Sequence, residues 1–201
     1  MPADIATRRS RRIILTLLTL FFGSLAAAFL LFYLGFRPPG STSHGELIQP
    51  VRPLPNQVLL TADDQTLDSE FLRSKWSLAY VGAGTCDARC REALTLTRQV
   101  RLALGKDSER VQRVFFVTRD CCDQQYLLAE QPGLITARLD EAADRQLLAL
   151  FPGTGATTAS EAGRIYIIDP LGNLMMSYEP GSAPKGLLED LKKLLKLSHI
   201  G

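Results

Sequence analysis

Four cysteines in two pairs are the residues of this chain whose type and spacing could do chemistry. Cys86 and Cys90 form a Cys-x-x-x-Cys motif, and Cys121 and Cys122 are adjacent. Neither pair would close a long loop, so a disulfide within either pair would constrain the unfolded chain very little. The spacing therefore favours redox or metal chemistry, and the alternative for Cys86 and Cys90 is a small inert disulfide.

The spacing of Cys86 and Cys90 suits the start of a helix, which we expect from about Cys86 to Leu104. Residues four apart on a helix share a face, so the two sulfur atoms could approach one another. A helix N-terminus and the positive charges of Arg89 and Arg91 favour the thiolate, which is the nucleophile and the metal ligand. Such a pair can cycle between dithiol and disulfide, or bind Cu(I) with two soft ligands.

An apolar run without charged residues, from 13 to 36, precedes the cysteines. As a helix it would exceed the ~30 Å hydrocarbon core of a bilayer, and it is longer than the ~7–15-residue core of a cleaved signal peptide. Four arginines lie between residues 8 and 12 and only Arg37 follows closely, so the basic side would stay in the cytoplasm. A single-pass anchor is predicted; a cleaved signal, or a twin-arginine signal at Ser10–Leu15, is the alternative.

The sequence predicts four parts: a basic cytoplasmic N-terminus (1–12), a transmembrane helix (13–36), a proline- and glycine-containing tether (37–50) and one domain (51–201). The topology suits the bacterial inner membrane with the domain in the periplasm. A mitochondrial inner-membrane protein facing the intermembrane space would have the same topology. The net charge of +2 and the lack of a basic stripe interleaved with aromatics exclude nucleic acid as a partner.

The order of the expected elements predicts an α/β, thioredoxin-like fold. After a hairpin within 57–67 we expect strands at 77–82, 111–118, 134–137, 165–168 and 174–178, and helices at 86–104, 124–130, 141–150 and from Pro184. In the thioredoxin plan the dithiol lies between the first central strand and the following helix. Cys86 falls at that junction.

The chain resembles the Sco family from about residue 50 to 197. The resemblance rests on Leu78–Gly82 followed by the Cys86-x-x-x-Cys90 motif, and on the downstream run Ile165–Gly172. Sco proteins are membrane-tethered thioredoxin-fold proteins that help to assemble the copper centre of cytochrome c oxidase. The resemblance implies an assembly factor that uses Cys86 and Cys90 for copper delivery or for thiol reduction of the copper site. Its partner would be an oxidase subunit or another copper or thiol assembly protein.

The chain departs from the family at two places. Asp87 and Arg91 stand where Sco proteins usually carry prolines. The family's third copper ligand is a histidine, which would fall at about Glu161, and no histidine occurs between residues 45 and 198. A carboxylate is a poor ligand for Cu(I), so a complete Cys₂His site cannot be carried over. His44 and His199 are expected to be solvent-exposed bystanders.

Cys121 and Cys122 follow the strand at 111–118, whose end is expected at the same edge of the sheet as the dithiol. One of them could supply a third soft ligand or act as a resolving partner to Cys86; the alternatives are a pair of small buried residues or a vicinal disulfide. Two other functions stay open. One is a membrane-tethered thiol–disulfide oxidoreductase without a metal role, and the other is a non-catalytic docking module of the oxidase assembly machinery.

Overall fold

The computed structural model describes residues 3–35, 43–140, 142–198 and 200. It divides into two units, 1–42 and 43–201, which are treated separately below. Residues 37–42 of the predicted tether and the histidine at 199 lie outside the described residues, as do the side chains before residue 11.

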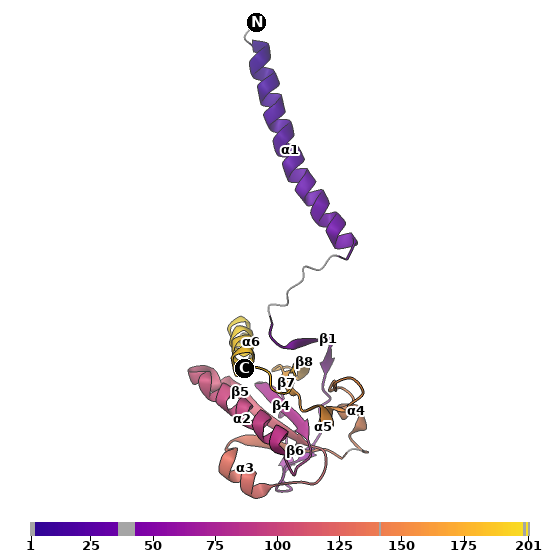
Figure 1. Cartoon of the computed structure of the whole chain (residues 1–201), viewed down its shortest axis with the longest axis vertical. Helices are drawn as coiled ribbons and strands as arrows, with labels where there is room; N and C mark the ends of the chain where they lie inside the picture. Colours follow the sequence, from indigo (N-terminus) through magenta and orange to yellow (C-terminus); the bar gives the residue numbers. More distant parts are fainter. Residues whose placement is uncertain (1–2, 36–42, 141, 199, 201) are drawn as a thin grey trace. The chain divides into compact units, whose positions relative to one another are not determined.

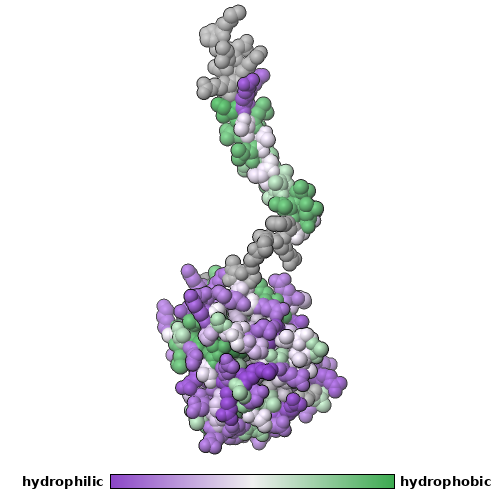
Figure 2. Space-filling model, viewed as in Figure 1, coloured by the Kyte–Doolittle hydropathy of each residue, from purple (hydrophilic) through white to green (hydrophobic). Residues whose placement is uncertain are grey.

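The first unit is one long helix, α1 (Ala3–Tyr33) (Figure 1). Its segment Arg11–Tyr33 is long and apolar enough to cross a membrane, and apolar residues cover much of its surface (Figure 2). The hydroxyls of Thr16 and Thr19 donate to the carbonyls of Arg12 and Leu15, four residues earlier. Because these polar groups are satisfied within the helix, they do not oppose its placement in lipid.

The second unit is built on an eight-stranded sheet with the order β1-β8-β7-β4-β5-β6-β2-β3. The strands are β1 (Glu46–Pro53), β2 (Leu59–Leu60), β3 (Thr66–Leu67), β4 (Trp76–Gly82), β5 (Val111–Val117), β6 (Leu134–Arg138), β7 (Ile165–Ile168) and β8 (Asn173–Tyr178). β4, β5 and β6 run parallel, while β7 and β8 are antiparallel to their neighbours. This arrangement confirms the predicted thioredoxin-like α/β fold.

Helices pack on the sheet: α2 (Ala88–Ala103), α3 (Gln124–Glu130), α4 (Arg145–Leu148), α5 (Ala159–Ala162) and α6 (Pro184–Leu197), with a 3₁₀ turn η1 (Gly105–Arg110). Successive residues of β4 point to opposite faces, so Leu78 and Tyr80 join one core cluster, and Ala79 and Val81 join another. Residues of α2 and α6 complete the first cluster. Residues of α4 and α5 complete the second. A strand buried on both faces explains the continuous apolar run that predicted it.

The sheet begins earlier than the predicted domain boundary at residue 51. β1 starts at Glu46, within the segment predicted as the tether, and pairs antiparallel with β8 through Leu47 and Met176. Pro50 and Pro53 lie in this edge strand, where a missing N–H is tolerated because one side of the strand has no neighbour. The tether was predicted from Pro38, Pro39 and Gly40, which precede this strand.

Two predicted helices are shorter than expected. The helix predicted over 141–150 is reduced to α4, because the carboxylate of Asp140 accepts from the N–H groups of Ala142 and Ala143 and forms a side-chain turn instead. The helix predicted from Cys86 begins two residues later, at Ala88. The short helix α5 was not predicted.

Candidate redox site

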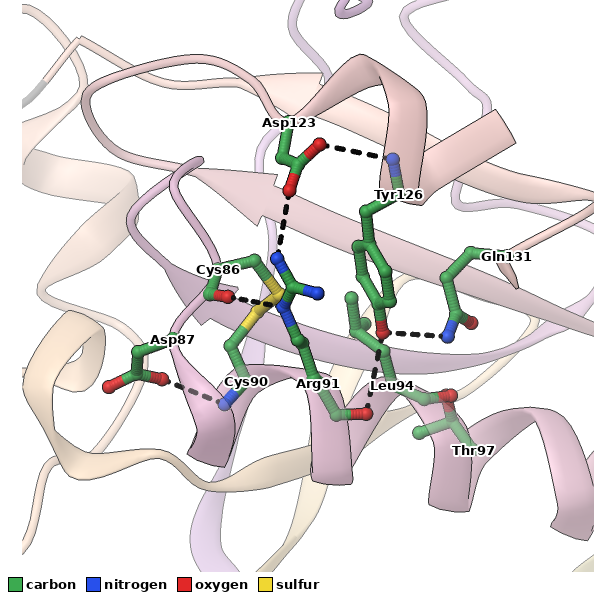
Figure 3. Close-up of a disulfide and its surroundings, with 9 residues drawn as sticks. All are labelled: Cys86, Asp87, Cys90, Arg91, Leu94, Thr97, Asp123, Tyr126 and Gln131. Atoms are coloured by element: carbon green, nitrogen blue, oxygen red, sulfur yellow. Dashed lines mark hydrogen bonds and ion pairs between the residues drawn. A yellow bond between two sulfur atoms is a disulfide. The ribbon is translucent and has the colours of Figure 1, made fainter. Parts of the chain in front are cut away.

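Cys86 and Cys90 lie at the junction of β4 and α2 and are joined by a disulfide (Figure 3). Cys90 occupies the first turn of α2, but Cys86 precedes the helix and has a φ of 45°, which non-glycine residues rarely adopt. The expectation that one helix face carries both sulfurs is therefore wrong. The turn before the helix brings the two Cα atoms to 5.1 Å.

Asp87, between the two cysteines, fixes the start of α2. It is the N-cap residue, and its Oδ1 accepts a hydrogen bond from the backbone N–H of Cys90 at 2.9 Å. Cys86 and Cys90 are only 2% and 3% exposed and belong to the core cluster shared by β4, α2 and α6. The oxidised pair is thus buried beneath the polar residues that surround it.

Arg91 connects the disulfide to the start of α3 (Figure 3). Its Nε donates to the carbonyl of Cys86 at 3.1 Å, and its Nη2 lies 2.8 Å from Oδ2 of Asp123. The guanidinium carbon lies 4.4 Å from the ring centroid of Tyr126, whose hydroxyl accepts from Nε2 of Gln131 at 2.9 Å. The sequence predicted that the charge of Arg91 favours the thiolate. In the structure, Arg91 also joins the Cys86 backbone to the start of α3.

Sequence reasoning missed Asp123 and Tyr126 as neighbours of the site. Asp123 is the N-cap of α3, and its Oδ1 accepts from the N–H of Tyr126 at 3.0 Å. An aspartate immediately before a predicted helix is a capping signal, so the cap could have been recognised. The pairing of the same carboxylate with Arg91 could not, because it depends on how α2 and α3 pack.

Arg89 extends from the motif to the position expected for the family's third ligand. Its Nη1 donates to the backbone carbonyl of Glu161 at 3.2 Å, and it lies against Gly163, where a Cβ would collide with the arginine side chain. Glu161, the position to which the sequence comparison assigned the third ligand, therefore does lie next to the cysteine motif. In the part of the chain that the structure describes, no group of three or more Cys, His, Asp or Glu side chains could hold a metal.

Cys121 and Cys122 form a vicinal disulfide, one of the alternatives left open by the sequence. They follow β5, which is parallel to β4, and the loops after the two strands are hydrogen-bonded to one another. Gly84 donates to the carbonyl of Arg119 at 2.7 Å and accepts from the N–H of Asp123 at 3.1 Å. The expectation that the strand before Cys121 ends at the same edge of the sheet as the dithiol is confirmed. A ligand or resolving role for Cys121 or Cys122 stays a prediction.

His44 is exposed, as predicted, but it is not a bystander. Its ring atom Nδ1 lies 3.3 Å from Oδ1 of Asp190 in α6. Its backbone N–H donates to Oδ2 of the same carboxylate at 2.7 Å. The N–H of Gly45 and the hydroxyl of Tyr178 also donate to Oδ2. Burial raises the pKa of Asp190, but these hydrogen bonds outweigh it and hold the pKa below its usual value. The cluster fastens the N-terminal end of the domain to α6.

A groove of about 450 Å³ begins beside the motif and is bordered by α2. Arg89, Arg91 and Tyr126 line it together with Glu179 and Pro180 from the turn after β8. A second pocket, of about 530 Å³, contains Cys121. The site thus offers recesses beside both cysteine pairs.

Fold and site define a thioredoxin-like domain with a cysteine pair at the junction of β4 and α2, preceded by a helix able to span a membrane. A family model described as "Transmembrane-like, thioredoxin-like, C-terminal domain" matches residues 76–198, and the chain belongs to this family. Sequence comparison with curated proteins gave no match.

Several similar solved structures are those of Sco proteins. Yeast Sco1 is 16% identical with a TM-score of 0.62, and the alignment covers 75% of this chain and 98% of the yeast chain. Apo Sco1 from Thermus thermophilus is 20% identical with a TM-score of 0.60, covering 78% and 99%. Copper-bound ScoI from Bradyrhizobium japonicum is 20% identical with a TM-score of 0.54, covering 71% and 98%. The Sco-like thioredoxin fold expected from the sequence is confirmed.

Proposed function

We propose that this protein is a Sco-like assembly factor for a respiratory haem–copper oxidase, working through Cys86 and Cys90. The observation that carries the proposal is the cysteine pair at the β4–α2 junction of a Sco-like fold. Proteins of similar fold include copper-bound ScoI and BsSco, which has a disulfide switch and is described as a member of the Sco family of cytochrome c oxidase assembly proteins. The partner would be an oxidase subunit or another copper or thiol assembly protein.

Two modes of action are available to the reduced pair. It can take Cu(I) as cargo on two soft sulfur ligands, or it can reduce a disulfide of the partner's copper site. In the second mode a Cys86 thiolate attacks one partner sulfur, and Cys90 then resolves the mixed disulfide. The partner gains two electrons and two protons, and Cys86–Cys90 is oxidised. Thiol reduction fits this chain better because Arg89, not a histidine, reaches the place of the third ligand.

The proposal places the protein in the bacterial inner membrane as a single-pass protein. The arginines that precede the apolar segment of α1 support a cytoplasmic N-terminus and a periplasmic domain. Protease added to spheroplasts should then digest the domain while leaving the anchor in the membrane. A domain protected until the membrane is lysed would overturn this orientation.

Copper handling is tested on the full chain in detergent, with Cys86 and Cys90 reduced. It should compete stoichiometrically with a Cu(I) chelator, and Cys86→Ser should weaken binding by much more than tenfold because one of two ligands is lost. Thr85→Ala, an exposed neighbour in the same loop, is the matched control and should bind as the wild type does. A loss of less than about tenfold with Cys86→Ser would overturn the metal mode.

The second candidate function is a thiol–disulfide oxidoreductase without a metal role, which the absence of a three-ligand group among the described residues favours. It predicts a measurable dithiol–disulfide potential and trapping of a mixed disulfide with the partner by Cys90→Ser. Replacing both cysteines by serine should impair oxidase assembly in cells under either function. Normal assembly in that strain would leave only a docking role.

A further inference from the structure

The cysteine pair of the proposed function is poorly placed to meet another protein while oxidised. Thiol–disulfide exchange requires an attacking thiolate to reach a sulfur of the disulfide. Cys86 and Cys90 are 2% and 3% exposed, and the side chain of Arg91 lies beside them (Figure 3). A folded reductant therefore has only a restricted approach to this disulfide.

The second pair is placed differently. Cys121 is exposed and borders the 530 Å³ pocket, while Cys122 is partly buried and packs against the core cluster that contains Cys86 and Cys90. The vicinal disulfide thus has one end at the surface and the other against the core cluster that contains the buried pair. This arrangement suits a pair that passes electrons inward.

The loops that carry the two pairs are held together at three points. Gly84 makes hydrogen bonds to Arg119 and Asp123 on both sides of the vicinal cysteines, and a Cβ on Gly84 would lie 2.6 Å from the Cα of Cys121. Arg91 joins the carbonyl of Cys86 to the carboxylate of Asp123. All of these contacts lie on the Cys86 side of the first pair, so Cys86 is the partner that Cys122 would meet.

We propose that Cys121 and Cys122 are a second redox centre that relays electrons from an external protein dithiol to the Cys86–Cys90 disulfide. The inference rests on the proposed function and adds the route by which its cysteine pair is reduced. A partner dithiol first reduces Cys121–Cys122 and becomes a disulfide itself. The vicinal pair is then a dithiol beside the buried disulfide.

The internal step balances without a further reactant. The Cys122 thiolate attacks Sγ of Cys86, a Cys86–Cys122 bond forms, and Cys90 leaves as a thiolate. The Cys121 thiolate then attacks Sγ of Cys122, re-forms the vicinal disulfide and releases Cys86. Two electrons and two protons have moved from the vicinal pair to Cys86 and Cys90.

The intermediate can be tested directly on the full chain in detergent. The double variant Cys90→Ser, Cys121→Ser retains only Cys86 and Cys122, and we expect these to form an intramolecular disulfide in a glutathione buffer. The matched control is Cys86→Ser, Cys121→Ser, which retains Cys90 and Cys122. Peptide mapping without reduction measures how much of each disulfide forms. The effective concentration for the Cys86–Cys122 bond should be about tenfold higher than that for the Cys90–Cys122 bond in the control. Equal or absent formation in the two variants would overturn the assigned route.

The rate at which Cys86–Cys90 is reduced provides a second test, which does not depend on the folding of the two trapping variants. Reduction of Cys86–Cys90 by reduced thioredoxin should be about tenfold slower in Cys121→Ser, Cys122→Ser than in the wild type, because the relay is lost. Reduction by a small phosphine, which needs no protein docking, should be similar in both. An unchanged rate with thioredoxin would overturn the relay. Neither readout involves copper or the oxidase, so failure of the proposed function is detected separately.

Discussion

Nη2 of Arg91 lies 2.8 Å from Oδ2 of Asp123, and this ion pair joins the helix that carries Cys90 to the loop that follows the vicinal cysteines. The same guanidinium donates through Nε to the carbonyl of Cys86. One side chain therefore holds the backbone of the first cysteine pair and the end of the second loop at the same time. Its substitution should affect both pairs together.

The ion pair itself should contribute little to stability. Asp123→Asn removes the charge but keeps an oxygen that can cap α3, so we expect a loss of at most about 1 kcal/mol, because both partners are substantially exposed. Asp123→Ala also removes the cap and should cost about 1 kcal/mol more. Urea unfolding of the oxidised protein measures both changes. Equal losses in the two variants would contradict the capping role.

Asp87 should stabilise the start of α2 through its oxygen atom and not through its charge. Asp87→Ala removes the acceptor of the Cys90 N–H and should lower the free energy of unfolding by about 0.5–2 kcal/mol. Asp87→Asn retains a good cap and should unfold within a few tenths of a kcal/mol of the wild type. The comparison is made by urea unfolding with Cys86–Cys90 oxidised. An asparagine variant as unstable as the alanine variant would show that the charge matters.

Gly84 should not tolerate a side chain. A Cβ there would lie 2.6 Å from both the backbone oxygen of Asp120 and the Cα of Cys121, and neither backbone atom can move aside as a side chain could. We therefore expect Gly84→Ala to destabilise the protein by about 1–3 kcal/mol, measured by urea unfolding. Thr85→Ala, in the same loop but exposed, should change stability by no more than about 0.5 kcal/mol. Similar values for the two variants would mean that the loops are not packed as described.

The carboxylate of Asp190 should make stability depend on acidic pH. Its hydrogen bonds hold its pKa below the ordinary value of about 3.9 even though burial opposes this. A lowered folded-state pKa stabilises the protein above about pH 3.9, and this contribution is lost as the pH falls through the folded value. The urea midpoint should therefore decline from about pH 5 to pH 3. The decline should be shallower in Asp190→Asn, whereas Asp63→Asn, at an exposed turn, should leave it unchanged.

The elements that position the cysteine pair could be predicted because their signals are local. The apolar runs of β4, β5 and β7 and the amphipathic pattern of α6 depend only on neighbouring residues, and they gave the element order. β1 was missed because it has few buried positions and contains two prolines. Its assignment as a strand depends on pairing with β8, more than a hundred residues away.

The surroundings of the cysteines were predictable only in part. The loop of Cys121 was correctly predicted to lie near that of Cys86, because the carboxyl ends of adjacent parallel strands lie at the same edge of the sheet. The partners of Arg89, Arg91 and His44 were not predictable, because each reaches a residue between 32 and 146 positions away. Such contacts are set by packing of the whole domain.

The contact between Arg89 and Gly163 also constrains how this protein can change during evolution. Gly163 has a φ of 65°, and Asn or Asp are the residues with side chains that best tolerate this region. Either would place a Cβ where the Arg89 side chain now lies. A substitution at 163 therefore requires the Arg89 side chain to move aside or residue 89 to become shorter. Homologous sequences should show the two positions covarying, with long residues at 89 enriched beside a glycine at 163.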